Sequence, residues 1–267
     1  MLRVPYDNLK GIVILSKEYR PIMAISETFL SLGDDHNMTD TANPGKTLLC
    51  TVDGEDYLRI PIRTQLITRN DNMIDIVNQY AKGRMKPGDI LFLSEKAVAC
   101  TQGRAIPVET IRPRKLAVTL SRYVTKTPAG IGLGIPETME MALRECGTLR
   151  ILFAAFCSVV GKLLGKKGWF YMVAGPKARG IDGPTAGTIP PYDRYVVLAP
   201  ADPRGTAKKL AQGLGCPVAI VDINDLGANI LAFSEKAPPT NWLARVLADN
   251  PLGQGEEGTP MGILRKA

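Results

Sequence analysis

The chain has 267 residues, enough for one large domain or two small ones with a sizeable core. Hydrophobic residues make up 45% and charged residues 22%, which is ordinary for a globular enzyme, and the net charge of +7 favours anionic partners such as nucleotides and phosphorylated substrates. Lysine and arginine form no tract of five or more, so the charge does not by itself indicate a nucleic-acid-binding protein.

Composition also disfavours a metal site or catalytic centre built from cysteine or histidine. The five cysteines form no Cys-x-x-Cys pair, and their odd number argues against a disulfide framework. The single histidine, His36, lies in a loop-like run and cannot build a multi-histidine site. Ser-His-Asp and Cys-His chemistry is correspondingly disfavoured.

No segment has the pattern of a signal peptide or a membrane span. The most apolar stretch, Ile151–Val160, is bracketed by Arg150 and Lys162, whereas a span needs about twenty apolar residues. The first residues, Met1–Asp7, lack a charged-then-apolar pattern. We therefore expect a cytoplasmic protein without a membrane partner.

Residues 1–56 are predicted to form an N-terminal extension of strands and loop. Gly11–Leu15 and Leu48–Val52 are strand candidates, and residues 33–46 are rich in Asp, Asn, Gly and Pro and indicate a long loop. We find no catalytic signal in this extension. Residues 57–267 are expected to form the main domain.

The main domain is expected to begin with a strand over Leu58–Ile62. Asp71 is then expected to cap a helix that carries Ile74, Val77 and Ala81 on one face.

A turn over Lys86–Asp89 and a buried strand over Asp89–Ser94 follow. Residues 116–124 alternate enough to predict another strand. Pro136 is expected to start a helix, and residues 149–164 to form a second, more buried one.

The clearest supersecondary unit is a strand-helix-strand pattern. Tyr195–Ala199 predicts a strand, Asp202 caps the helix that follows, and Gly213 and Gly215 end it. The next strand is Pro217–Val221, and such units are normally parallel and right-handed. A helix over residues 242–248 and a strand over residues 261–264 end the chain. Together these elements predict an α/β protein with mixed sheets of α+β character.

Two glycine-rich runs resemble nucleotide-binding motifs but fail on detail. Residues 161–168 lack the spacing of a Walker phosphate loop and the Ser or Thr after its lysine. Residues 130–134 have Ile135 where a dinucleotide fingerprint needs its third glycine. The first is typical of a basic helix end and the second of a flexible connection.

Two aspartates next to strand candidates are the main functional signal. Asp182 lies in the turn-rich run Gly180–Thr185, and Asp222 follows the apolar strand Val218–Val221. Open α/β sheets place ligands at the carboxyl ends of their strands. Carboxylates there suit Mg²⁺ or Mn²⁺, and a metal site that handles phosphate is predicted.

Several alternatives remain open for this site. Asp in a Gly-Pro turn commonly caps local backbone amides, so each aspartate has an ordinary structural reading. Asn224 or Asp225 could turn inward as well. The acidic run Gly253–Gly258 could complete the site, or Glu256 and Glu257 could be solvated loop charges.

Arg104 also has two readings. It could clamp a phosphate with its two-pronged guanidinium, or it could pair with Glu109 or another acid for structural reasons.

At these residues the chain resembles the coenzyme F420-0:L-glutamate ligase (gamma-glutamyl ligase) family over roughly residues 58–265. The resemblance rests on four blocks in the family's order, and their order and spacing are more specific than any one block. They are Ile62–Ile67 with Asp71; Gly88–Lys96 ending in Gln102-Gly103-Arg104; Gly180-Ile181-Asp182; and Val221-Asp222 with the later Gly253–Pro260.

The resemblance implies a two-lobed gamma-glutamyl-ligase-like fold and an intertwined homodimer. It implies an enzyme that uses GTP and Mg²⁺ or Mn²⁺ to activate the carboxylate of a phosphorylated, coenzyme-like substrate as an acyl phosphate, which the amine of an amino acid then attacks. It assigns metal binding to Asp182, Asp222, Gln254 and Glu256. It assigns nucleotide contacts to Thr64, Gln65, Leu66, Ile67, Ser94, Lys96 and Thr185.

The chain departs from the family pattern at positions near substrate and nucleotide. Pro184 and Thr185 stand where the family has Ser-Asn, Ile223 where it has Thr, and Cys100 near a family lysine. Asp71-Asn72 stands where the family has paired acids. These departures favour either a shifted substrate or a non-catalytic nucleotide- or anion-binding protein on the same scaffold. A nucleic-acid-binding role is the third and least favoured reading.

Overall fold

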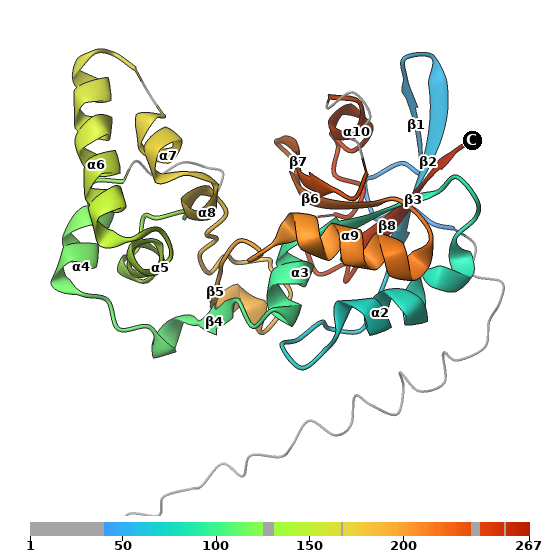
Figure 1. Ribbon diagram of the computed structural model, residues 1–267, viewed down its shortest axis with the longest axis horizontal. Helices are drawn as coiled ribbons and strands as arrows, with labels where there is room; N and C mark the ends of the chain where they lie inside the picture. The colour runs from blue at the N-terminus through green and yellow to red at the C-terminus, as the bar shows by residue number, and fades with distance from the viewer. Residues whose placement is uncertain (1–39, 125–130, 167, 236–240, 254) are drawn as a thin grey trace, which may run out of the picture. The chain divides into compact units, whose positions relative to one another are not determined.

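The computed structural model describes residues 40–124, 131–166, 168–235, 241–253 and 255–267. The described elements belong to one unit, residues 40–267, and Figure 1 shows their arrangement. The expected strand at Gly11–Leu15, His36 and the expected metal ligand Gln254 lie outside the described residues.

A six-stranded mixed sheet forms the larger part of the fold, in the order β1-β2-β8-β3-β6-β7 (Figure 1). Among the strands of the described residues, only the β3–β6 pair is parallel, and the other four pairs are antiparallel. The strands are β1 (Leu49–Val52), β2 (Glu55–Ile62), β3 (Ile90–Ser94), β6 (Val218–Asn224), β7 (Gly227–Phe233) and β8 (Met261–Lys266).

The sequence explains which strands are central. β3 reads Ile-Leu-Phe-Leu-Ser, and its three middle residues have no exposed surface, as expected for a strand covered on both faces. β1 and β2 are joined by Asp53-Gly54, both with positive φ, which is the turn that suits a two-residue hairpin.

The two faces of this sheet pack against different helices. Leu91, Leu93 and Ile220 join a core with α2 (Met73–Tyr80) and α9 (Pro203–Leu214). The alternate residues, including Phe92, Ala219 and Val221, pack with Leu243 of α10 (Asn241–Val246). The period-two alternation of a strand therefore assigns these residues to opposite faces.

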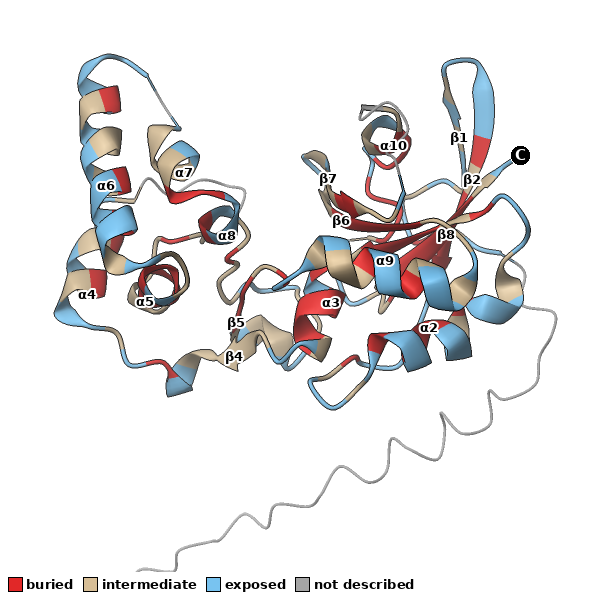
Figure 2. Ribbon diagram, in the orientation of Figure 1, coloured by how far each residue is buried: buried red, intermediate tan, exposed pale blue. Residues whose placement is uncertain are grey.

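A second core is mainly helical and includes Val196 of the two-stranded sheet formed by β4 and β5, which lies at the edge of the helices (Figure 2). Its strands are β4 (Ala105–Pro107) and β5 (Tyr195–Val197). The helices are α4 (Lys115–Ser121), α5 (Pro136–Cys146), α6 (Thr148–Leu163), α7 (Trp169–Ala174) and α8 (Pro176–Arg179). Helix α3 (Glu95–Thr101) follows β3, and short 3₁₀ turns cover Lys82–Arg84, Val108–Thr110 and Tyr192–Arg194.

Many predicted elements are confirmed. The strands at 48–52, 58–62 and 89–94, the helix that starts at Pro136 and the glycine-ended helix after Asp202 occur within one to three residues of the expected bounds. Asp202 accepts a hydrogen bond from the Gly205 amide at 2.8 Å, as a helix cap should.

Two local predictions were wrong. In one the hydrophobic period was assigned to a strand instead of a helix, and in the other the wrong residue was assigned as the helix N-cap. Residues 115–121 form helix α4 rather than a strand, with Ala117 and Ser121 buried one turn apart. Asn72, not Asp71, caps α2, because Asp71 instead accepts hydrogen bonds from the amide and hydroxyl of Thr68. The N-cap of α2 is therefore one residue later than predicted. Of the three residues predicted on one face of this helix, Val77 and Ala81 are buried and Ile74 is exposed.

The expected parallel strand-helix-strand unit was also wrong. β5 pairs antiparallel with β4 in the small sheet, whereas β6 pairs with β3 in the large one. Helix α9 therefore connects two sheets instead of crossing over within one. A sequence pattern that alternates strand and helix does not specify which strands become neighbours.

Helix α6 occurs where predicted, but it is less buried than helix α5, contrary to the prediction. Only Ile151, Ala154 and Gly161 are buried along it. In the described part of the chain no single helix has the length and apolarity to cross a membrane, and the α5–α6 pair that passes on length and composition is bent by 116°.

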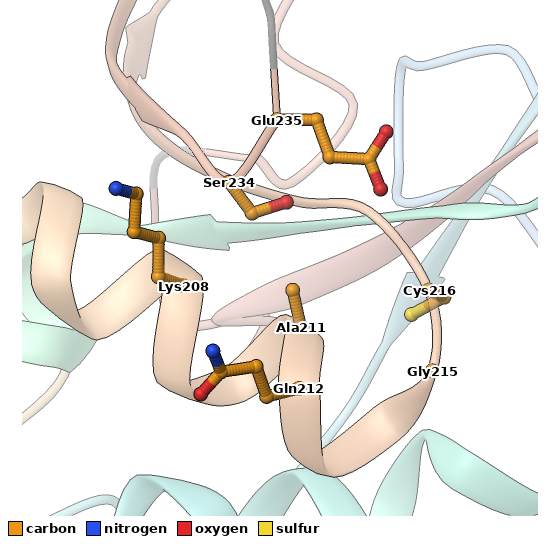
Figure 3. A pocket seen from close by; sticks show the side chains of 7 residues that line it. All are labelled: Lys208, Ala211, Gln212, Gly215, Cys216, Ser234 and Glu235. Carbon is orange, nitrogen blue, oxygen red and sulfur yellow. The ribbon is translucent and has the colours of Figure 1, made fainter.

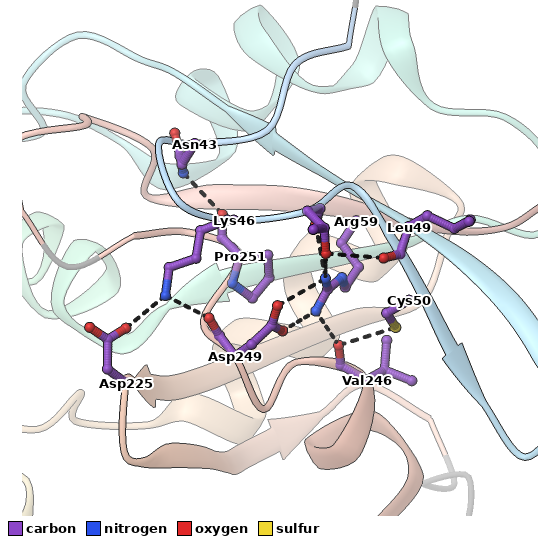
Figure 4. Close-up of polar contacts among 10 residues, drawn as sticks. Asn43, Lys46, Leu49, Cys50, Arg59, Asp225, Val246, Asp249 and Pro251 are labelled. Atoms are coloured by element: carbon purple, nitrogen blue, oxygen red, sulfur yellow. Dashed lines mark hydrogen bonds and ion pairs between the residues drawn. The ribbon is translucent and has the colours of Figure 1, made fainter.

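Residues 43–47 contact the C-terminal segment (Figure 4). The buried Arg59 side chain forms an ion pair with Asp249 and donates to the carbonyl of Thr47 at 2.9 Å. Lys46 donates to Asp225 at 2.8 Å and to the Asp249 carbonyl at 2.7 Å. Since β1 also joins the large sheet, residues 46–52 pack with the elements that follow them.

Candidate active site

The parallel pair β3–β6 brings three charged side chains to one edge of the large sheet. Ser94, the last residue of β3, lies opposite Val221. The chain then turns into α3, whose first residues are Glu95 and Lys96, while β6 continues to Asp222. Because parallel strands end at the same edge, these residues are neighbours although they are more than a hundred positions apart in sequence.

Asp182 reaches the same place from the small sheet. Its amide donates to the Val197 carbonyl and its carbonyl accepts from the Val197 amide, both at 2.9 Å, which extends the β5 side of that sheet. A Cβ on Gly180 would lie 2.8 Å from the Ala199 Cβ, so glycine is required for this approach. The turn-rich sequence around Asp182 therefore has a packing reason.

Lys96 and Asp182 form an ion pair at the centre of the site. Lys96 Nζ lies 2.9 Å from Asp182 Oδ2, and the two side chains are 51% and 45% exposed. Both groups therefore remain accessible to a ligand. In this structure the ammonium group of Lys96 balances the negative charge of Asp182.

The electrostatics of the surrounding groups show that the acids interact. Burial, followed by repulsion from Asp222 and Asp182, raises the pKa of Glu95 to about 8. Burial and repulsion from Asp182 likewise raise the pKa of Asp222. Burial alone would lower the pKa of Lys96, but attraction and a hydrogen bond to Asp182, with attraction to Glu95 and Asp222, outweigh it and raise the pKa. The two predicted aspartates therefore share one electrostatic site.

Glu95 was missed by the sequence reasoning. It is buried at the start of α3, although glutamate is rarely buried without a partner. The signal was present: Ser94-Glu95-Lys96 directly follows an apolar strand, and such strand ends are where α/β sheets place functional groups. Burial of Glu95 could not be read from that position, because the first turn of most helices is solvated.

The oxygen ligands at this site suit a cation that also binds phosphate oxygens of a substrate. They do not form a complete metal site by themselves. The described residues contain no cluster of three or more His, Cys, Asp or Glu disposed to hold a metal. Mg²⁺, however, commonly uses one or two carboxylates, with water and substrate phosphates as its other ligands. Asp182 and Asp222 fit that mode. Glu256 is exposed on a separate loop.

That loop is anchored beside the same sheet edge. The Thr64 amide donates to the Gly258 carbonyl at 3.0 Å, and the Ser94 amide donates to the Pro260 carbonyl at 2.8 Å. The first, second and fourth sequence blocks of the predicted site therefore meet here. Thr64 and Ser94 are the residues through which the first two blocks contact the C-terminal loop.

The other expected nucleotide contacts differ in accessibility. Ile67 is buried in the core, and its carbonyl accepts from the Tyr192 hydroxyl at 2.6 Å. Gln65 and Leu66 are exposed, and Gln65 donates to Asp71 at 3.1 Å. Thr185 is exposed three residues after Asp182, and its hydroxyl donates to the Gly183 carbonyl.

The surroundings of Arg104 and Cys100, two residues considered at the sequence level, indicate structural roles. Arg104 forms a 2.6 Å ion pair with Glu145 and donates to the Ala199 carbonyl, so its acidic partner is not Glu109. Cys100 is buried, and burial raises its pKa to about 11. Its thiol therefore stays neutral at physiological pH and cannot supply the charge of a lysine.

An open hollow elsewhere is not part of this arrangement (Figure 3). It lies between the C-terminal half of α9 and the end of β7. Its lining includes Lys208, Gln212 and Glu235, and none of the acids of the candidate site.

A known protein family matches a range of the chain that covers most of these blocks. The family model described as F420-0:Gamma-glutamyl ligase matches residues 61–225, more than half of the chain. That range includes Lys96, Asp182 and Asp222, but not the loop at 253–258. No curated protein gives a significant match.

Proposed function

Because the chain belongs to the F420-0:gamma-glutamyl ligase family, we propose that it is a GTP- and metal-dependent ligase that joins a carboxylic acid to an amino acid through an amide bond. The observation that carries the proposal is the meeting of Lys96, Asp182 and Asp222 at one edge of the sheet. A family match alone would not say whether this chain retains an active centre.

The proposed reaction has two steps. The substrate carboxylate attacks the γ-phosphate of GTP, forming an acyl phosphate and releasing GDP. The amine of the amino acid then attacks the acyl carbon, and phosphate leaves. A bound divalent cation would supply charge neutralisation at the phosphoryl oxygens, with Asp182 and Asp222 holding it.

Lys96 has two roles in this proposal. Without ligand, its ammonium group balances Asp182 at 2.9 Å. When a cation and a triphosphate occupy the site, Asp182 gains a new partner, and the half-exposed Lys96 side chain is able to turn to a phosphate oxygen. The substrate is expected to be phosphorylated because the net charge of +7 favours polyanions. The cytoplasmic location expected from the sequence is part of the same proposal.

Phosphate release tests the reaction. The full chain is incubated with GTP, Mn²⁺ and a panel of phosphorylated acids, with and without amino acids. A ligase releases phosphate in step with amide formation, and only when acid and amine are both present. Release that is indifferent to the amine would identify a hydrolase and contradict the proposal.

Changes at the ligand positions favour one alternative, a nucleotide- or anion-binding protein without turnover. Pro184 and Ile223 stand where the family resemblance expects Ser and Thr, and Cys100 lies near the position of an expected lysine. Isothermal titration with GTP and Mn²⁺ separates the two functions, because tight binding with no turnover under any acceptor supports the alternative.

Asp182→Asn and Asp222→Asn are expected to abolish Mn²⁺-dependent GTP binding and turnover while leaving the fold nearly unchanged. Each substitution keeps the side-chain shape and removes one charge from a partly exposed position. Binding is measured by titration and folding by thermal unfolding. Asp75→Asn, on the exposed face of α2, is the matched control. Full Mn²⁺-dependent binding in either site variant would remove that residue from the site.

A further inference from the structure

A turn near the start of the described chain places two polar side chains against the C-terminal segment (Figure 4). Asn43-Pro44-Gly45-Lys46 form a β-turn, in which the Lys46 amide donates to the Asn43 carbonyl at 3.0 Å. Proline suits the first central position of such a turn, and Gly45 has a φ of 73°, as the second central position of a type II turn requires. The sequence of the turn therefore fixes the backbone from which Asn43 and Lys46 reach their partners.

The Asn43 side chain closes the base of the C-terminal loop. It is buried, and its amide nitrogen donates to the Pro251 carbonyl and to Thr259 Oγ1, both at 2.9 Å. These two acceptors use both hydrogens of the amide. The Thr259 hydroxyl in turn donates to the Leu252 carbonyl at 2.6 Å. Asn43 therefore joins the two ends of the loop to each other.

Thr259 lies between the two residues through which the loop contacts the candidate site. The residue before it accepts a hydrogen bond from the Thr64 amide at 3.0 Å, and the residue after it accepts one from the Ser94 amide at 2.8 Å. Ser94 ends β3, two residues before Lys96. A shift of Thr259 would therefore disturb both contacts and the segment that carries Lys96.

Lys46 links the same turn to the strand that carries Asp222. Its ammonium group donates to Asp225 Oδ1 at 2.8 Å and to the Asp249 carbonyl at 2.7 Å. Asp225 follows β6 directly, three residues after Asp222. The turn therefore contacts the supports of two parts of the candidate site, the C-terminal loop and the end of β6.

We propose that Asn43 is a positioning residue for the nucleotide site. It holds the C-terminal loop against Thr64 and Ser94, and thereby fixes the segment that carries Lys96 for GTP and its metal ion. The identity of the ligand rests on the proposed function. The role of Asn43 goes beyond the family match, because this residue lies before the matched residues 61–225. Its acceptors are Pro251 and Thr259, so it acts on the site through the loop.

Hydrogen exchange tests whether Asn43 holds the loop, and this measurement needs no nucleotide. In Asn43→Ala, the Thr64 and Ser94 amides should exchange about tenfold faster than in wild type, because their acceptors lose buried hydrogen bonds that support them. Glu140→Gln is the matched control. It weakens buried hydrogen bonds within the helical core and should leave both amides protected. Unchanged exchange of both amides in Asn43→Ala overturns the proposal.

Nucleotide binding tests whether the held loop serves the site. Titration with GTP and Mn²⁺ should give an affinity roughly tenfold lower in Asn43→Ala than in wild type, as for other residues that orient a metal site from outside it. In turnover, the KM for GTP should rise by a similar factor while kcat stays nearly unchanged, because Asn43 contacts no reacting atom. Glu140→Gln should match wild type. Faster amide exchange together with wild-type affinity in Asn43→Ala would also overturn the proposal.

A second variant, Thr259→Val, keeps the side-chain shape and removes the hydroxyl that accepts from Asn43. It should reproduce both effects. The loss of affinity in the double variant should be smaller than the product of the two single losses, because the two residues share one contact. A full product would show that Asn43 acts by another route.

The outcome that contradicts the proposed function is a different one. A wild type that binds no GTP would remove the nucleotide from this inference together with the proposed ligase. Amide exchange would then still decide whether Asn43 holds the loop, with faster exchange of the Thr64 and Ser94 amides in favour and unchanged exchange against.

Discussion

Lys96 is the residue whose surroundings most constrain how the candidate site works. It is the cation nearest to Asp182, and it interacts with Glu95 and Asp222 as well. An incoming metal ion must therefore compete with an ammonium group that is already in place. For the proposed reaction, this competition predicts that a metal ion binds weakly by itself and more tightly together with a triphosphate.

Lys96→Gln is expected to have opposite effects on two ligands. Affinity for Mn²⁺ alone should rise by about fivefold, because the competing ion pair is worth about 1 kcal/mol when half exposed. Affinity for GTP in the presence of Mn²⁺ should fall by roughly tenfold, because one charged phosphate contact is lost. Titration calorimetry measures both.

Lys96→Arg is the control, since it keeps the charge. If Lys96→Gln weakens both ligands alike, Lys96 stabilises the site as a whole and does not compete with the metal. Unchanged affinities for both ligands would place Lys96 outside the binding mechanism.

At the scale of single elements, helix α5 is fixed by a buried carboxylate. Glu140 is 1% exposed and accepts hydrogen bonds from the Arg114 backbone amide, the Arg114 side chain and the Arg144 side chain. Burial alone would raise the pKa of Glu140, but the hydrogen bonds from Arg114 and Arg144 outweigh it, and the pKa is lowered. This cluster ties α5 to the segment that begins α4.

Glu140→Gln is expected to destabilise the fold by about 1–3 kcal/mol at neutral pH. A carboxyl group with a lowered folded-state pKa contributes stability above its unfolded pKa, and that contribution is lost as pH falls through the folded value. The difference between wild type and variant in urea unfolding should therefore shrink below about pH 4. Glu109→Gln, at an exposed position, should show no such difference. A difference that is constant with pH would mean that packing, not charge, holds Glu140.

At the scale of the whole molecule, contacts of residues 40–52 are expected to stabilise the six-stranded sheet, which β1 joins. The Asn43 side chain donates to the Pro251 carbonyl and to Thr259 Oγ1, both at 2.9 Å. Lys46 and Thr47 add contacts to Asp249 and Arg59. The domain boundary at 56/57 that composition predicted therefore has a direct experimental test.

Two shortened chains provide this test. A chain that starts at residue 40 is expected to unfold at the temperature of the full chain. A chain that starts at residue 57 loses β1 and several buried hydrogen bonds of about 1 kcal/mol each, so it should be less stable by about 2–4 kcal/mol and unfold roughly 5–15 °C lower. Equal stability of the two would support the predicted boundary.

The sequence by itself determined much of the local structure. Apolar runs such as Ile90–Leu93 identified buried strands, and Asp202 and Gly215 marked the ends of a helix, because these signals act between residues that are close in the chain. The family also followed from the order of short motifs, which needs no knowledge of contacts. The same reasoning identified Asp182 and Asp222 as candidates.

Only the tertiary structure decided which strands are neighbours, which acids are buried and which helix face is left uncovered. Strand order depends on pairing across long loops, so β5 joined β4, and the parallel partner of β6 was β3. The burial of Glu95 and the exposure of Phe156 both depend on what packs against a helix from outside it. Strand order and the burial of these side chains depend on contacts between segments that are distant in the sequence. A local sequence pattern does not specify such contacts.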